Sequence, residues 1–265
     1  MKLNNLFISL RKLALPFFVM LVYLFLYIPI IVLVMFSFNE SASGYAWTGF
    51  TFDWYHKLFQ SKEIWIAFIN SMIVATSAVV LSVTMGVLIV WGLSDRFYYL
   101  ISMFYSTMMI PDIVIAVGLL VFFDFLSIPL GLTTLIVGHT LLGLGFVVPT
   151  IYSRFLELDY QTVEASLDLG ATEWQTFMRV ILPFLTPAII SSALSVFILS
   201  FDDFLVSFFC SGSSSQTLSL YIFAMIRAGL SPVINALSTL ILISSIILVA
   251  FFSLVKINPE RPKYD

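Results

Sequence analysis

Charged side chains are scarce in this chain, because Asp, Glu, Lys and Arg make up only 10% of its 265 residues. Soluble domains carry about 25% charged residues. Apolar residues account for 60%, and the mean hydropathy of +1.06 is far above that of a water-soluble domain. The net charge is −3, without a basic patch suited to nucleic acid. These absences exclude a soluble globular protein and a nucleic-acid-binding protein, and they indicate an integral membrane protein.

The sequence also lacks the residues that metal, disulfide or nucleotide chemistry needs. Its only cysteine, Cys210, has no partner for an internal disulfide. His56 has no metal-ligand companions at a suitable spacing, and His139 is interpreted as a hydrogen-bonded packing residue. No G-x-x-x-x-G-K-[ST] motif is present, so any ATP that drives this protein is bound by another polypeptide. We therefore expect no cofactor and no enzymatic activity of the chain itself.

Six apolar stretches are long enough to cross about 30 Å of hydrocarbon at roughly 1.5 Å per residue. They lie near residues 15–38, 65–93, 100–126, 133–152, 184–209 and 233–255. The first is expected to be an anchor, because its apolar run is too long for a cleaved signal peptide. Pro29 and Pro111 are expected to kink their helices. The sequence thus predicts an all-α integral membrane protein with one transmembrane domain spanning residues 1–265.

The distribution of Lys and Arg predicts the orientation. With the N-terminus in the cytoplasm, nine of the 12 basic residues lie inside: Lys2, Arg11, Lys12, Arg96, Arg154, Arg179, Lys256, Arg261 and Lys263. Only Lys57, Lys62 and Arg227 lie outside. Because cytoplasmic loops are enriched in Lys and Arg, both termini and the polar segment at 164–183 are expected in the cytoplasm.

That polar segment, EASLDLGATEWQTFMRVILP, holds more charges than a lipid-spanning helix tolerates. Gly170 is typical of the position just past a helix end. Thr172 and Gln175 form a capping box that starts a second helix. Pro183 predicts a boundary where the next apolar run begins. The segment therefore predicts two short helices with a sharp break, a shape suited to docking.

The second of these helices carries an apolar face made of Trp174, Phe177, Met178 and Ile181. Such a face fits a groove on a partner protein. It fits equally an amphipathic helix that lies on the membrane surface. The residues alone leave both interpretations open.

The segment 164–183 resembles the EAA loop of ABC-importer membrane subunits, in which E-A-A precedes a glycine and then I-x-L-P. Glu164, Ala165, Gly170 and Pro183 are in register with that pattern, and Ser166 replaces its second alanine. Other segments resemble spermidine/putrescine permease subunits of the PotC type: YIPI at 27–30, FSFN at 36–39, PDIV at 111–114, LSFDD at 199–203 and SPVINAL at 231–237. The resemblance covers most of the chain from residue 27 to residue 240.

This resemblance implies the type I ABC-importer permease fold, with six transmembrane helices and a cytoplasmic coupling loop at 160–183. It implies four partners in a bacterial inner membrane: a cytoplasmic ATP-binding subunit dimer, a second and distinct permease, an extracytoplasmic substrate-binding protein and the lipid bilayer. The ATPase-coupling residues that it implies are Glu164, Ala165, Ser166, Asp168, Gly170, Trp174, Phe177, Arg179 and Pro183. The implied function is polyamine import.

Carboxylates inside the apolar stretches predict the cargo. Asp112 follows Pro111 in the third stretch, and Asp202 and Asp203 lie late in the fifth. A charge at membrane depth is costly, so such residues usually face a cavity or a partner. No Lys or Arg lies inside the six stretches, and an acidic pathway with aromatic rings suits a cation such as a polyamine. Adjacent helical residues point about 100° apart, so which of Asp202 and Asp203 faces the pathway stays open. Asp124 is interpreted as a solvated end residue.

Three alternatives remain. The chain could be an ABC permease for another small solute. It could be an ion-coupled secondary transporter or channel with Asp112 and Asp202 as ion sites, although the cytoplasmic loop would then have no role. An intramembrane aspartyl protease would pair two carboxylates, but the G-x-G-D motif of such enzymes is absent.

Overall fold

The computed structural model describes residues 2–41, 46–93, 98–229 and 231–254. Within these residues all regular structure is helical, apart from one isolated bridge between Asn39 and Phe50. The predicted all-α class is therefore confirmed. Contacts divide the chain into two compact units, Met1–Lys62 with Ala224–Asp265, and Glu63–Phe223.

Four described helices are long and apolar enough to cross a membrane: Leu15–Phe36 within α1 (Lys2–Phe36), Lys62–Gly92 within α3 (Lys62–Leu93), α6 (Leu132–Phe155) and the continuous helix Glu173–Asp202. A bent pair, Ile101–Thr107 with Asp112–Phe125, makes a fifth crossing if it is counted as one. Helix α12 (Pro232–Leu254) coincides with the sixth predicted stretch. The apolar stretches of the sequence thus form helices.

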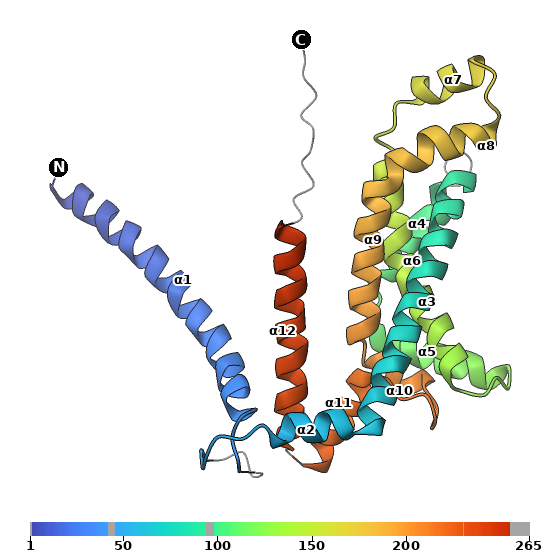
Figure 1. Cartoon of the computed structure of the whole chain (residues 1–265). Coiled ribbons are helices and arrows are strands. Elements are labelled where there is room, and N and C mark those ends of the chain that lie inside the picture. The colour runs from blue at the N-terminus through green and yellow to red at the C-terminus, as the bar shows by residue number, and fades with distance from the viewer. Residues whose placement is uncertain (1, 42–45, 94–97, 230, 255–265) are drawn as a thin grey trace. The chain divides into compact units, whose positions relative to one another are not determined.

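The third predicted helix, 100–126, is instead two helices. α4 (Tyr98–Thr107) and α5 (Asp112–Phe125) meet at an angle of 109° (Figure 1). Pro111 is the physical reason, because proline lacks an N–H and disfavours helical backbone in the residue before it. Its own backbone is extended, with φ −58° and ψ 133°. As a result, Asp112 begins a helix instead of lying inside a straight one.

The structure differs from the predicted fifth helix, 184–209, at both of its ends. Upstream, α8 (Glu173–Thr176), the π-helical turn η1 (Phe177–Ile181) and α9 (Leu182–Asp202) follow one another directly, so no boundary lies at Pro183. A π-helical turn placed before a proline accommodates its missing hydrogen bond. Downstream, α9 stops at Asp202. Asp203 is extended, with φ −62° and ψ 130°, and the short α10 (Leu205–Cys210) follows.

Helix α6 is the central helix of the unit Glu63–Phe223. It packs against α4, α5, α9 and α10, and 72% of its most apolar window is buried. Gly143 permits this packing, since a Cβ there would lie 3.0 Å from side-chain atoms of Ser82 on α3 and Val196 on α9. Small residues let membrane helices approach closely in this way.

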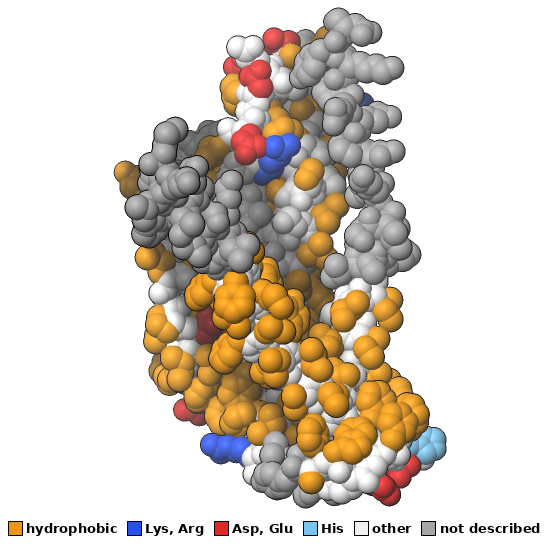
Figure 2. Space-filling view, turned by 90° about the vertical axis from the view of Figure 1, so that its left-hand side faces the viewer, with side chains coloured by type: hydrophobic (Ala, Val, Ile, Leu, Met, Phe, Trp, Pro, Cys, Tyr) orange, Lys and Arg blue, Asp and Glu red, His pale blue; other side chains and the backbone are white. Residues whose placement is uncertain are grey.

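In the unit formed by Met1–Lys62 and Ala224–Asp265, α12 packs against α1 and against α2 (Asp53–Gln60). The buried Asn39 organises the segment between α1 and α2. Its Nδ2 donates to the carbonyl of Ala46 at 2.7 Å, and its own carbonyl accepts the indole N–H of Trp54 at 2.7 Å. Within Leu15–Phe36 the most apolar window of α1 has no buried residue. Figure 2 shows a broad hydrophobic surface with few charged side chains, which suits contact with lipid.

Candidate functional site

The polar segment forms a protrusion at one end of the unit Glu63–Phe223, made of α7 (Tyr160–Asp168) and α8 (Figure 1). The break between the helices falls at Gly170, whose φ of +84° favours glycine because a Cβ would be strained there. Thr172 then starts α8. Its Oγ1 accepts the N–H of Gln175 at 3.3 Å, and its own N–H donates to Gln175 Oε1 at 2.9 Å. The predicted first helix, break and capping box are confirmed, but the second helix is not short, because it continues through η1 into α9.

A hydrogen bond joins the two helices of this protrusion. The hydroxyl oxygens of Ser166 on α7 and Thr176 at the end of α8 lie 2.9 Å apart. Thr176 is only 2% exposed, so its hydroxyl depends on this partner. Ser166 was predicted to be an ATPase-coupling residue and a small replacement for alanine. The bond gives Ser166 a contact within its own chain that links α7 to α8.

Most of the predicted coupling residues are exposed, either on the protrusion or on the helix that continues from it: Glu164, Ala165, Asp168, Gly170, Trp174, Arg179 and Pro183. Phe177 is not. It is 3% exposed, and its ring stacks on Trp91 of α3 with centroids 4.4 Å apart and planes inclined by 26°. Ile181 is also buried, at 5%. The prediction of a single apolar docking face is therefore wrong for these two residues, because they complete the apolar core of their own chain.

A hollow of about 460 Å³ lies under α7. Tyr160, Val163 and Leu167 of α7 line one side, and Trp91 and Ile181 are among the residues that line the other. Within Tyr160–Asp168 no residue is buried. Helix α7 is thus the part of the protrusion least covered by its own chain.

The predicted pathway carboxylates lie where helices begin, end or break. Asp112 is the exposed first residue of α5, and Asp202 is the exposed last residue of α9. The side chain of Asp203 is only 9% exposed. Helix α5 packs against α10, so the third and fifth apolar stretches lie side by side. Asp124 is exposed near the other end of α5.

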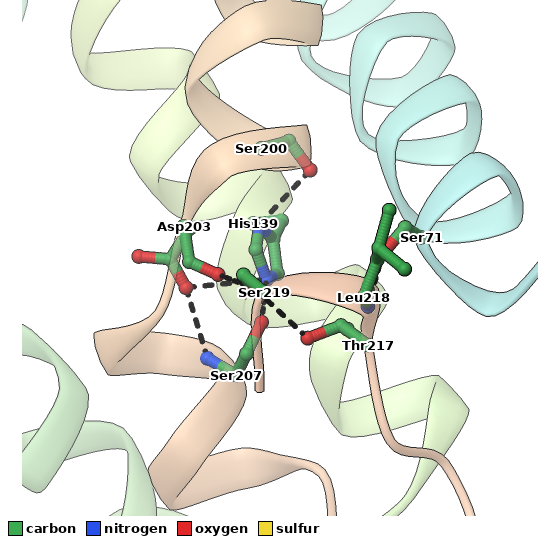
Figure 3. Close-up of polar contacts among 8 residues, drawn as sticks. All are labelled: Ser71, His139, Ser200, Asp203, Ser207, Thr217, Leu218 and Ser219. Carbon is green, nitrogen blue, oxygen red and sulfur yellow. Dashed lines mark hydrogen bonds and ion pairs between the residues drawn. The ribbon is translucent and has the colours of Figure 1, made fainter. Parts of the chain in front are cut away.

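Asp203, at the break between α9 and α10, has polar partners on α6 and on the chain that follows the break (Figure 3). Its Oδ2 accepts the N–H of Ser207 at 2.9 Å, and its backbone carbonyl accepts the hydroxyl of Ser219 at 2.5 Å. The same Oδ2 lies 3.7 Å from Nε2 of His139 on α6. A broken helix in apolar surroundings leaves backbone groups unpaired, and these side chains supply their partners.

His139 lies behind this break and is 1% exposed. Its Nδ1 is 2.9 Å from the hydroxyl of Ser200, which precedes the break, and its Nε2 is 3.5 Å from the hydroxyl of Ser207, which follows it. The prediction that His139 is a hydrogen-bonded packing residue is confirmed.

The sequence of this chain is similar to that of a known family of membrane proteins. Residues 78–261 match the family of binding-protein-dependent transport system inner membrane components. The chain belongs to this family. It is an inner membrane permease with several membrane-crossing helices, which favours the importer hypothesis over the secondary-transporter and protease hypotheses.

Several curated permeases are similar along nearly their whole length. The permease is 39% identical over 243 residues to the spermidine/putrescine transport system permease protein PotC of Haemophilus influenzae, covering 90% of this chain and 94% of that one. It is 38% identical to PotC of Escherichia coli K12, covering 90% and 92%. It is 32% identical to the putrescine transport system permease protein PotI of the same strain, covering 89% of each chain.

A solved structure matches the fold. It is the crystal structure of a bacterial ABC transporter involved in the import of the acidic polysaccharide alginate, with a TM-score of 0.74 and 18% identity. The match covers 92% of the permease and 96% of that chain. At this identity the likeness shows the fold alone, which is that of an ABC-importer permease.

Sequence reasoning missed Trp91, Thr176, Ser200, Ser207 and Ser219. Their partners lie on other helices, so no local spacing reveals them. One signal was available for the serines: Ser and Thr are dense between residues 200 and 219, within and after an apolar stretch. Hydroxyls at membrane depth often bond across helices, and this density pointed to a polar packing site.

Proposed function

We propose that this permease is the membrane-spanning subunit of an ATP-driven importer, and that it forms part of the pathway for polyamines such as spermidine and putrescine. The observation that carries the proposal is the 39% identity to a spermidine/putrescine permease over 90% of the chain. The exposed carboxylates Asp112 and Asp202 support it, because a linear polyamine is a polycation.

The proposed topology has six crossings: α1, α3, the bent pair α4–α5, α6, α9 with α10, and α12. The bias of nine basic residues inside to three outside supports a cytoplasmic location for both termini and for the α7–α8 protrusion. Residues 39–63 then lie on the opposite side, where a binding protein delivers the cargo.

The protrusion is proposed to dock on a cytoplasmic ATP-binding subunit, since the sequence has no nucleotide-binding motif of its own. The exposed residues of α7 and α8 make the contact. The helix that begins at Glu173 runs without a break to Asp202, so it links the docking end mechanically to the carboxylates. Phe177 acts inside this linkage, because its stack on Trp91 ties the docking end to α3.

The assembly needs further subunits. The permease carries one docking loop, so a dimer of ATP-binding subunits requires a second loop from another permease, which we propose to be a distinct homologue. The family depends on a binding protein, and we propose that a soluble extracytoplasmic one presents the polyamine.

The proposed cargo contacts are Asp112 and Asp202, with Asp203 behind them. The sequences of α5, α9 and α10 contain no Lys or Arg to neutralise these carboxylates. Phe201 and Phe204 flank the two adjacent aspartates, and each packs against another ring: Phe201 on Phe68 at 6.3 Å and Phe204 on Phe223 at 4.5 Å. Aromatic faces near carboxylates favour ammonium groups.

Uptake by the assembled importer tests the proposal. Radiolabelled spermidine uptake is measured in cells that lack their own polyamine importers and express the permease with its ATP-binding subunit, partner permease and binding protein. We expect ATP-dependent uptake that unlabelled putrescine or spermidine inhibits and neutral sugars do not. Uptake that persists without the ATP-binding subunit would contradict the importer assignment, whereas ATP-driven uptake of a neutral or anionic solute in place of spermidine would contradict the cargo.

A further inference from the structure

Two adjacent carboxylates at the α9–α10 break have different surroundings. Asp202 is exposed, whereas the side chain of Asp203 is 9% exposed and faces α6. The extended backbone of Asp203 changes the chain direction between them. At this break the carboxylate of Asp202 therefore points outward and that of Asp203 points inward.

His139 contacts the chain on both sides of this break. Ser200 precedes it at 2.9 Å from Nδ1, and Ser207 follows it at 3.5 Å from Nε2. An imidazole suits this place, since its two ring nitrogens point in different directions from one rigid ring. The inward Asp203 carboxylate lies 3.7 Å from the same Nε2 (Figure 3).

A second set of bonds holds the following segment on the other flank. Ser71 of α3 accepts the N–H of Leu218 at 2.8 Å, and Asn70 donates to the carbonyl of Gln216 at 3.0 Å. Ser219 then donates to the carbonyl of Asp203. These bonds hold the chain after the break, but they do not reach the residues before it. His139 does reach them.

We propose that His139 is a positioning residue that holds the α9–α10 break, so that Asp202 faces the pathway and Asp203 is held inside. The inference rests on the proposed function, because it assigns the pathway carboxylate of that site. In this proposal Asp202 contacts the cargo, and Asp203 is a structural carboxylate that bonds the chain at the break. Replacement of His139 frees both residues to reorient.

Thiol labelling of the assembled importer measures this orientation directly. Cys210, the only native cysteine and a buried one, is replaced by alanine, and a single cysteine is introduced by Asp202→Cys or by Asp203→Cys. The probe is 2-aminoethyl methanethiosulfonate, a small cation. With His139 present, we expect the thiol at 202 to react about tenfold faster than the thiol at 203, because thiol modification follows exposure. In the His139→Leu background the ratio is expected to fall to about one to threefold.

Thr140→Val is the matched control. Thr140 is the next residue of α6 and is 7% exposed, but among the described residues its hydroxyl bonds only the Ile136 carbonyl of its own helix, at 2.6 Å. This variant is expected to keep the tenfold ratio. A general loosening of the core would expose the thiol at 203 in Thr140→Val as well, and would therefore lower the ratio in both variants.

An unchanged ratio in His139→Leu would overturn the proposal, and so would an equal fall of the ratio in Thr140→Val. If His139→Leu does not assemble with its partners, Ser200→Ala combined with Ser207→Ala removes the same two contacts and decides the question by the same ratio. Labelling needs neither cargo nor ATP. Failure of the polyamine assignment would therefore appear in uptake and not in this ratio.

Discussion

The indole ring of Trp91 stacks on the ring of Phe177, with centroids 4.4 Å apart and planes inclined by 26°. Trp91 lies near the end of α3, and Phe177 begins the π-helical turn that leads into α9. Trp174 extends the group outward, with its ring 5.4 Å from that of Phe177, and is itself 53% exposed. The stack thus joins the exposed protrusion to two apolar helices, and a force applied to the protrusion reaches both.

Removing the ring of Phe177 should weaken the contact between the protrusion and α3. We expect Phe177→Ala to lower the free energy of unfolding by about 3–5 kcal/mol, because a buried aromatic side chain leaves a cavity. Thermal unfolding of the purified complex measures the loss, and uptake per ATP hydrolysed measures the coupling. Trp174→Ala is the control, since it removes an exposed ring and should reduce stability much less. Equal destabilisation by the two variants would contradict the buried role of Phe177.

Gly170 sets the angle of the protrusion. Its φ of +84° lies in the left-handed region, and no atom of the described residues lies within 4 Å of the place that a Cβ would take, so Gly170→Ala adds strain without a clash. We expect a cost of about 1–2 kcal/mol, seen as roughly five- to thirtyfold weaker binding of the ATP-binding subunit. Gly118→Ala is the control, because Gly118 also has open space but lies inside α5 without a positive φ. The interpretation fails if both variants bind the subunit as the unmodified permease does.

The Ser166–Thr176 bond should stiffen α7 against α8. Ser166→Ala removes it, and the expected loss is about 1 kcal/mol. Hydrogen–deuterium exchange should show faster exchange of amides in α7 and little change in α6. Thr176→Ser keeps a hydroxyl at the partner position and should preserve the slow exchange. If Ser166→Ala left exchange in α7 unchanged, the bond would have no part in fixing the angle.

Neutralising the exposed carboxylates should affect the cargo more than the docking. We expect Asp112→Asn and Asp202→Asn each to lower spermidine uptake about tenfold, because a desolvated ammonium group loses its charge partner. Binding of the ATP-binding subunit should not change. Asp124→Asn, at the other end of α5, is the matched control and should transport normally. Equal uptake by all three variants would contradict the assignment of Asp112 and Asp202 to the cargo pathway.

Local signals predicted much of this permease. The apolar stretches gave helices, and Gly170, Thr172 and Gln175 gave the break and cap of the protrusion, because helix ends depend on residues a few positions apart. The bend before Asp112 was only partly foreseen. Pro111 predicted a kink, but proline alone does not specify a turn of 109°. Packing of α5 against α10 accompanies that larger angle.

The inward direction of Phe177 and the break at Asp203 were not predictable. Both depend on partners from other helices: Trp91 from α3 for the first, and His139 from α6 for the second. The spacing of residues along one helix predicts which of them share a face. It does not predict which other helix that face packs against.

The amino-acid sequence by itself determined that this protein lies in a membrane, which segments are helical, and where a polar protrusion interrupts them. Hydropathy and helix capping depend on residues that are close together along the chain, so they can be predicted from the sequence. The tertiary structure alone decided that Asp202 is exposed while Asp203 is held beside His139. That choice depends on which hydroxyl, imidazole and backbone groups meet across helices, and buried polar groups adopt the arrangement that gives each of them a partner.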